Sequence, residues 1–108
     1  MKPLKFLADS LDRLREFPVP AQSIAGFQLD RVQRGIAPDD WKPMPAIGVG
    51  VREIRVREIS GAFRVVYLAT LPDAVYVLHA FRKTTQKTEG RDIALATQRL
   101  KDLMRNKT

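Results

Sequence analysis

Basic side chains recur on three segments of the chain that have the residue pattern of β-strands. Arg55 and Arg57 lie on the first segment, Arg64 on the second, and Arg82 and Lys83 at the end of the third. A guanidinium group can bind two phosphate oxygens at once, so arginines on neighbouring strands can form a site for a phosphate anion. These residue types predict phosphate binding, provided that the strands bring the side chains to one face of a sheet.

Arg64 is the most informative of these residues because it interrupts an apolar run. An arginine that only solvates a surface is not expected there, which favours a functional role; a snorkelling side chain or a structural ion pair is the alternative. Phe81 and Tyr76 lie among the charges, where an exposed aromatic ring can stack on an unpaired base. Lys87 and Arg91 follow in the adjoining loop and helix start, and could add phosphate contacts.

Two side chains could transfer protons. His79 is the only histidine, and the ordinary pKa of histidine lies near neutrality. Glu53 is a carboxylate placed between arginines. Each also has a structural alternative, because His79 stands between two apolar residues like a core histidine and Glu53 could be an ion-pair partner. The chain has no cysteine and a single histidine, so neither a zinc–cysteine site nor a histidine-rich metal site is expected. No cofactor is predicted.

Composition and charge restrict the class of protein. The 108 residues, 44% hydrophobic and 29% charged, predict one folded domain over residues 1–108. The net charge is +7, and residues 51–108 hold twelve basic and six acidic residues. We therefore expect a polyanionic partner to face this half. No apolar run is long enough to span a membrane, and the first residues lack the pattern of a signal peptide, so a cytoplasmic location is expected.

The hydrophobic pattern predicts a strand, two helices, a long loop, three strands and a final helix. Prolines at 18 and 20 separate the two helices, because proline disfavours a helical conformation in the residue before it. Short turns join the last three strands, which predicts an antiparallel meander. The expected elements are a strand over 4–7, a helix from Asp9 or Ser10, a helix from Pro20 to a C-cap at Gly35, a loop over 36–50, strands over 51–58, 62–70 and 74–82, a polar loop over 83–90, and a helix with Ile93, Ala96, Leu100 and Leu103 on one face.

This order predicts an α+β fold in which helices cover one face of a small antiparallel sheet and the other face stays partly open. The basic side chains would then converge on the open face. Trp41 would close the edge of the sheet, with stacking on a ligand as the alternative for its ring. The anion site requires that Arg55 and Arg64 point to the same side of the sheet. It also requires that carboxylates beneath the surface do not neutralise them.

Four segments carry a more specific signal: 50–56 (Gly-Val-Arg-Glu-Ile-Arg-Val), 63–67 (Phe-Arg-Val-Val-Tyr), 77–83 (Val-Leu-His-Ala-Phe-Arg-Lys) and 85–88 (Thr-Gln-Lys-Thr). In this order and spacing they resemble the phage-derived, HigB-like branch of the RelE/ParE toxin superfamily, and the resemblance covers nearly the whole chain. It implies two N-terminal helices packed on one face of a small antiparallel sheet, with a C-terminal helix. It also implies the toxin of a type II toxin–antitoxin pair, in a hetero-oligomeric complex with an antitoxin that carries a helix-turn-helix domain.

The activity implied by the resemblance is ribosome-dependent cleavage of messenger RNA, without a metal. Two arginines would stabilise charge on a phosphate attacked by the ribose 2′-hydroxyl, two lysines would hold the RNA backbone, and a phenylalanine would stack a base. The proton-transfer group is left open between His79, Glu53 and the ribosome. The family pattern matches Glu53, Arg55, Arg64, Phe81, Lys83 and Lys87. With the other candidates from the residue pattern, we expect catalysis from Arg64, Arg55, Lys83, His79 and Glu53, and RNA contacts from Lys87, Phe81, Arg82, Arg57 and Arg91.

Two other functions are compatible with these residues. A toxin of the ParE branch would share the fold and poison DNA gyrase without nuclease activity, since fold alone does not fix function. A non-toxic nucleic-acid binding module would satisfy the charge equally well. Under the nuclease hypothesis, Arg64→Ala is expected to abolish toxicity and leave the fold and antitoxin binding intact.

Overall fold

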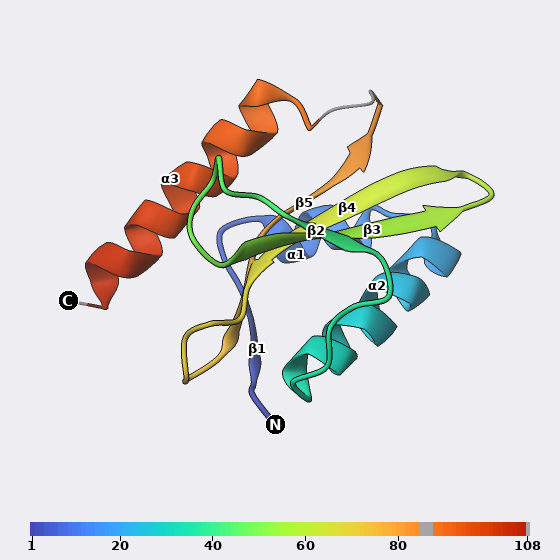
Figure 1. Ribbon diagram of the computed structural model, residues 1–108. Helices are drawn as coiled ribbons and strands as arrows, with labels where there is room; N and C mark the ends of the chain where they lie inside the picture. Colours follow the sequence, from blue (N-terminus) through green and yellow to red (C-terminus); the bar gives the residue numbers. More distant parts are fainter. Residues whose placement is uncertain (85–87, 108) are drawn as a thin grey trace.

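The computed structural model describes residues 1–84 and 88–107. Its elements follow the predicted order, with one strand added in the long loop (Figure 1). They are β1 (Leu4–Phe6), α1 (Ser10–Arg15), α2 (Val19–Gln33), β2 (Trp41–Pro43), β3 (Val51–Glu58), β4 (Gly61–Leu68), β5 (Val75–Lys83) and α3 (Gly90–Asn106). The predicted α+β class is therefore confirmed.

The sheet has five strands in the order β1-β5-β4-β3-β2. Strands β2 to β5 pair in antiparallel fashion, so the predicted meander of the last three strands is confirmed. Strand β1 differs, because it runs parallel to β5, with Leu4 opposite Val75. A parallel pair needs a long crossover connection between its strands, and the helices and the other strands supply it here. The sheet is thus mixed, with an antiparallel body and one parallel edge.

Helices cover both faces of the sheet, which corrects the expectation that they share one. Figure 1 shows α1 and α2 on one side and α3 on the other. Phe63 and Val65 of β4 belong to the core under α1 and α2, while Val66 and Leu68 belong to the core under α3. Because β4 and β5 are apolar on both faces, each face must be covered. The open surface is the end of the α3 face that α3 does not reach.

Strand β2 lies inside the segment that was predicted to be a loop, so that prediction is wrong at its three residues. Trp41 pairs with Ile54 at the edge of the sheet. The guanidinium carbon of Arg52 lies 4.0 Å from the centre of its ring, in a cation–π contact. A strand this short, ending in Pro43, carries too few residues for an alternating pattern, and proline is tolerated because the strand is at the edge.

The helix boundaries follow local sequence. Pro18 is the N-cap of α2, and Pro20 stands in its first turn, where the missing N–H has no helical partner in any case. The backbone of Gly35 has φ +81°, just beyond the end of α2, which is the conformation that favours glycine there. Helix α3 buries Ala96 and Leu103 against the sheet. Within the described ranges, no helix is both long and apolar enough to cross a membrane.

Candidate functional site

The strand register brings four basic side chains to the same end of the α3 face. Arg55 of β3 is directly opposite Arg64 of β4, and Arg64 is opposite Phe81 of β5. Residues opposite one another share a face, and so do residues two apart on a strand. The side chains line a groove of about 770 Å³, which we call the cationic groove. Its lining residues are Arg55, Arg57, Glu58, Gly61, Ala62, Arg64, Lys83 and Thr84.

Arg64 lies at the floor of the cationic groove and is only 4% exposed. Its Nη1 donates a hydrogen bond to the carbonyl oxygen of Phe63 at 2.9 Å. Its Nε lies 3.4 Å from Oε1 of Glu53, an ion pair without a hydrogen bond between these two atoms. Burial lowers the pKa of Arg64 most; Glu53 raises it, and Arg55 and Arg57 lower it further. Arg64 is therefore a desolvated cation beside two others.

Glu53 lies beneath Arg64 and has no exposed surface. Its Oε2 accepts a hydrogen bond of 2.8 Å from Oγ1 of Thr88. Its Oε1 faces Arg64 and also lies 3.9 Å from Nζ of Lys42. A buried carboxylate among cations acts first as their counter-charge. The geometry thus favours the ion-pair alternative for Glu53 over contact with a substrate.

Arg55 meets the first requirement set by the sequence, because it points to the same side of the sheet as Arg64. The second requirement is met only in part. Nη1 of Arg55 lies 3.7 Å from Oδ1 of Asp40, and Glu53 partly neutralises Arg64. Nε of Arg55 and Nε of Arg64 both lack a hydrogen-bond partner among the described residues. The carboxylates therefore lie near the arginines without holding them in hydrogen bonds at these atoms.

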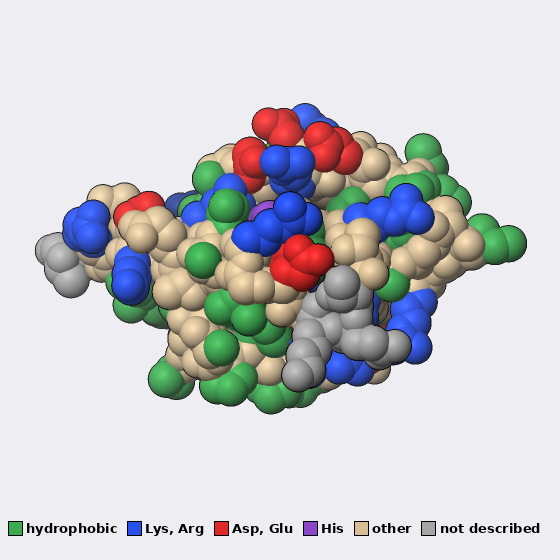
Figure 2. Space-filling model, turned by 90° about the horizontal axis from the view of Figure 1, so that it is seen from above, with side chains coloured by type: hydrophobic (Ala, Val, Ile, Leu, Met, Phe, Trp, Pro, Cys, Tyr) green, Lys and Arg blue, Asp and Glu red, His purple; other side chains and the backbone are tan. Residues whose placement is uncertain are grey.

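Lys83 and Arg57 complete the charge of the cationic groove. Lys83 stands at the end of β5, opposite Ala62, and has no hydrogen bond or ion pair with another described residue. Burial lowers the pKa of Lys83, and the neighbouring charge of Arg64 lowers it further. Arg57 is exposed on β3. The groove thus keeps available cations. Figure 2 shows Lys and Arg side chains spread over the whole face that is seen from above.

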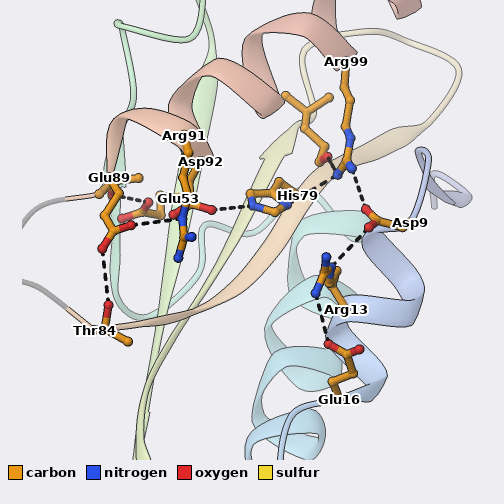
Figure 3. A network of polar contacts seen from close by, with 12 residues as sticks. Asp9, Arg13, Glu16, Glu53, His79, Thr84, Glu89, Arg91, Asp92 and Arg99 are labelled. Atoms are coloured by element: carbon orange, nitrogen blue, oxygen red, sulfur yellow. Dashed lines mark hydrogen bonds and ion pairs between the residues drawn. The ribbon is translucent and has the colours of Figure 1, made fainter.

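His79 lies apart from the cationic groove, although it shares its face of the sheet. A bulge in the pairing of β4 with β5 places His79 opposite Val66. Its Nε2 contacts Oδ1 of Asp92 at 2.8 Å, and its Nδ1 lies 3.4 Å from Nη1 of Arg99 (Figure 3). Burial lowers the pKa of His79, against a smaller opposing effect of Asp92. Both ring nitrogens are occupied, which favours the structural alternative for this residue.

The polar network around His79 joins three elements of the fold. Arg99 of α3 forms an ion pair with Asp9, just before α1, and donates a hydrogen bond of 2.9 Å to the carbonyl oxygen of Leu78. Asp9 also contacts Arg13 of α1 (Figure 3). These residues line a second cleft, of about 580 Å³, between α1 and α3. Asp92 and Arg99 are seven residues apart, two turns along one helix face, and that spacing could have predicted their common role.

The predicted RNA-contacting residues are divided between the two sides of the sheet. Phe81 is half-buried and stacks on His79, with ring centres 5.1 Å apart. Arg82 is opposite Phe63, so it starts from the other face, and its Nη2 donates to the carbonyl oxygen of Ser60 at 2.7 Å. Arg91 is exposed and pairs with Glu89. Lys87 lies outside the described residues. Of the predicted residues that the structure describes, only Arg55, Arg57, Arg64 and Lys83 line the groove together.

Sequence reasoning missed several residues that hold the site. Asp40 contacts Arg55, Lys42 and Thr88 contact Glu53, and Asp92 contacts His79. Lys42 was assigned to a loop, so its position next to β3 could not be foreseen. Among the described residues, no group of three or more His, Asp or Glu side chains has the arrangement of a metal site.

The fold and the groove define a class of protein: a small α+β domain with a cationic surface suited to an anionic ligand. Residues 12–101, which contain the whole groove, match the family described as Phage derived protein Gp49-like (DUF891). The chain belongs to this family, a toxin family of the RelE/HigB type. No curated protein matches the chain closely enough to be a relative.

Proposed function

We propose that this protein is the toxin of a toxin–antitoxin pair and that it cleaves messenger RNA on the ribosome as a metal-independent endoribonuclease. The observation that carries the proposal is the register of the hairpin, which sets Arg55 beside Arg64 in a groove that Arg57 and Lys83 also line. Membership in the Gp49-like family supports a toxin. Neighbouring cations in a groove support a phosphodiester as the ligand.

The chemistry needs stabilisation of charge more than a covalent role for the protein. The ribose 2′-oxygen attacks the adjacent phosphorus and loses its proton, and the bond from phosphorus to the 5′-oxygen breaks. The products are a cyclic 2′,3′-phosphate and a 5′-hydroxyl that gains a proton. Arg55 binds the phosphate from the side of the groove and Arg64 from its floor, where preorganised cations act most strongly on developing charge.

The group proposed for proton transfer is neither His79 nor Glu53, the two side chains that the sequence suggested. His79 and Glu53 are both held by partners away from the groove opening. Lys83 lines the groove, has no described partner, and has a pKa lowered by burial, which brings it closer to the range of a general acid or base. We assign proton transfer to Lys83, with the ribosome as the alternative source.

The partner of the free toxin is an antitoxin, in a hetero-oligomeric complex, as in the toxin class to which the family belongs. The antitoxin would carry a helix-turn-helix domain and repress its own operon. The substrate of the nuclease, messenger RNA in translation, places the activity in the cytoplasm. An adjacent reading frame that encodes a helix-turn-helix protein would support this part of the proposal.

Expression of the chain without its partner tests the function. Growth is followed and the 5′ ends of translated messages are mapped, with Arg55→Ala as the inactive control. Arrest with new cuts inside reading frames supports the nuclease, and Arg55→Ala should remove both effects. Absence of growth arrest would overturn the toxin proposal and leave a nucleic-acid binding module.

The near-complete burial of Arg64 favours a second candidate, a gyrase-inhibiting toxin without nuclease activity. A residue that is 4% exposed offers little surface to a scissile phosphate. In the experiment above, this candidate predicts growth arrest with DNA breaks and intact messages. The two candidates therefore differ in which nucleic acid is broken.

A further inference from the structure

Thr88 makes a contact that the proposed function does not use. It is the first described residue after Lys83 and Thr84 at the end of β5, and it stands two residues before the start of α3. Its hydroxyl donates a hydrogen bond of 2.8 Å to Oε2 of Glu53, 35 positions away in the sequence. The side chain of Thr88 therefore connects the approach to α3 with a buried carboxylate on β3.

The two oxygens of Glu53 have separate partners. Oε2 is held by Thr88, and Oε1 faces Nε of Arg64 at 3.4 Å and Nζ of Lys42 at 3.9 Å. A fully buried carboxylate is costly unless hydrogen bonds satisfy it. The hydroxyl of Thr88 is an uncharged donor, and it satisfies the Oε2 atom of this carboxylate with a hydrogen bond. It fixes one oxygen and thereby directs the other towards Arg64.

We propose that Thr88 is a positioning residue for the cationic groove: it orients the Glu53 carboxylate, which in turn sets the place and the charge of the Arg64 guanidinium. Without the hydroxyl, the carboxylate can rotate and draw closer to Arg64 or Lys42. A tighter pair with Glu53 would take charge away from the groove. The proposal rests on the proposed function only in assuming that Arg64 binds phosphate.

A merely structural role for Thr88 would be to anchor the start of α3. That role would lower the stability of the protein and leave the state of Arg64 unchanged once the protein is folded. The positioning role predicts a change at Arg64 itself in the folded protein. The Nε–Hε signal of Arg64 in nitrogen-15 NMR reports this atom directly, because Nε is the atom that faces Glu53.

The test compares the full-length wild type with Thr88→Val, which keeps the shape and removes the hydroxyl, and with Thr88→Ser, which keeps the hydroxyl. Thr97→Val is the matched control, since the hydroxyl of Thr97, among the described residues, bonds only to the carbonyl oxygen of Ile93 within α3. The readouts are the Arg64 Nε–Hε signal and the affinity for a short single-stranded RNA with 2′-O-methyl groups, which binds without being cleaved.

We expect Thr88→Val to shift the Arg64 signal and to weaken RNA binding by roughly tenfold, because a tighter pair with Glu53 weakens the charge-assisted contact of Arg64 with a phosphate. Thr88→Ser should restore both, and Thr97→Val should change neither. An Arg64 signal and an RNA affinity equal to those of the wild type in folded Thr88→Val would overturn the proposal.

Two further observations keep the test decisive. If Thr88→Val does not fold, the hydroxyl proton of Thr88 in the wild type must still exchange slowly enough with water to give its own signal, and its absence would overturn the proposal. If the wild type neither arrests growth nor cleaves messages, the proposed function fails separately. The Arg64 signal in Thr88→Val then still decides whether Thr88 positions Arg64.

Discussion

Arg55 and Arg64 stand directly opposite one another on β3 and β4, both on the face of the sheet that α3 partly covers. Like charges at opposed positions destabilise a sheet, and burial of Arg64 adds to that cost. The fully buried Glu53, two residues before Arg55 on the same strand, compensates from below. Two apolar side chains at these opposed positions would stabilise the sheet more than Arg55 and Arg64 do. Such a loss of stability is typical of a functional site.

The two arginines should respond differently to removal. Arg55 is partly exposed and its pair with Asp40 is loose at 3.7 Å, so Arg55→Ala should change the free energy of unfolding by no more than about 0.5 kcal/mol. Arg64→Ala leaves Lys42, at 3.9 Å, as the one ion-pair partner of Glu53 among the described residues, and should lower the free energy of unfolding by about 3 kcal/mol. Urea denaturation measures both values, and toxicity should be lost in both variants.

The loss of stability expected for Arg64→Ala differs from the sequence-based prediction that this variant leaves the fold intact. Arg64→Lys keeps a charge near Glu53 and is the matched control for stability. An Arg64→Ala protein as stable as the wild type would mean that Glu53 does not depend on Arg64 for compensation.

Binding of RNA should weaken at alkaline pH because of Lys83. Burial and the charge of Arg64 lower the pKa of Lys83 below the ordinary 10.5. A lysine with a lowered pKa loses its charge at a lower pH than an exposed lysine, so one phosphate contact is lost as the pH rises towards the lowered pKa.

Titration of the affinity for 2′-O-methylated RNA from neutral pH to about pH 10 measures this loss. Lys83→Arg should hold the affinity constant over that range; an identical decline in this variant would assign it to another group.

The hairpin of β3 and β4 shows how far the sequence determines the site. Alternation in 51–58 and a short turn were enough to predict both strands, and pairing of Glu58 with Gly61 then sets Arg55 opposite Arg64. The covering of both faces was also encoded in the apolar run of β4. Residues 65–68 alternate between the two cores, a sign that each face is buried.

The contacts that complete the site could not be predicted from local patterns. The bulge in β5 changes which side chains face α3, and nothing in the segment 77–83 marks it. Thr88 meets Glu53 and Asp92 meets His79 only because α3 packs back over the sheet. Such partners depend on tertiary packing, which a single sequence reveals poorly for short polar residues.

His79 should make the stability of the protein depend on pH. Its folded pKa lies below the unfolded value of 6.5 because of burial. Below 6.5 the unfolded state binds more protons than the folded state, so stability is full above that pH and falls as the pH decreases towards the folded pKa. Protonation of His79 would also place an N–H at Nδ1, facing the positively charged guanidinium of Arg99.

Urea denaturation from about pH 8 down to about pH 5 tests this dependence, since the pKa of an ordinary carboxyl lies below that range. His79→Gln, which retains a polar side chain without a titration in this range, should show a flatter profile. An equal slope in the wild type and in His79→Gln would show that His79 is not the titrating group.

The end of α3 is attached to the turn before β5 through Asp73, and this attachment should be lost in acid. Asp73 accepts hydrogen bonds from Lys107 and from the hydroxyl of Tyr76. These bonds, that of Lys107 first, lower the pKa of Asp73 from 3.8 to about 2. A depressed carboxyl pKa contributes stability that is full above 3.8 and is lost as the pH falls towards about 2. Asp73→Asn should lower the melting temperature at neutral pH, and this difference from the wild type should shrink through the same window. Asp102→Asn is the matched control, because Asp102 lies on exposed α3 surface and its partners among the described residues, Gln98 and Arg105, belong to its own helix. If Asp73→Asn and Asp102→Asn respond alike to acid, the attachment contributes nothing beyond a general surface charge.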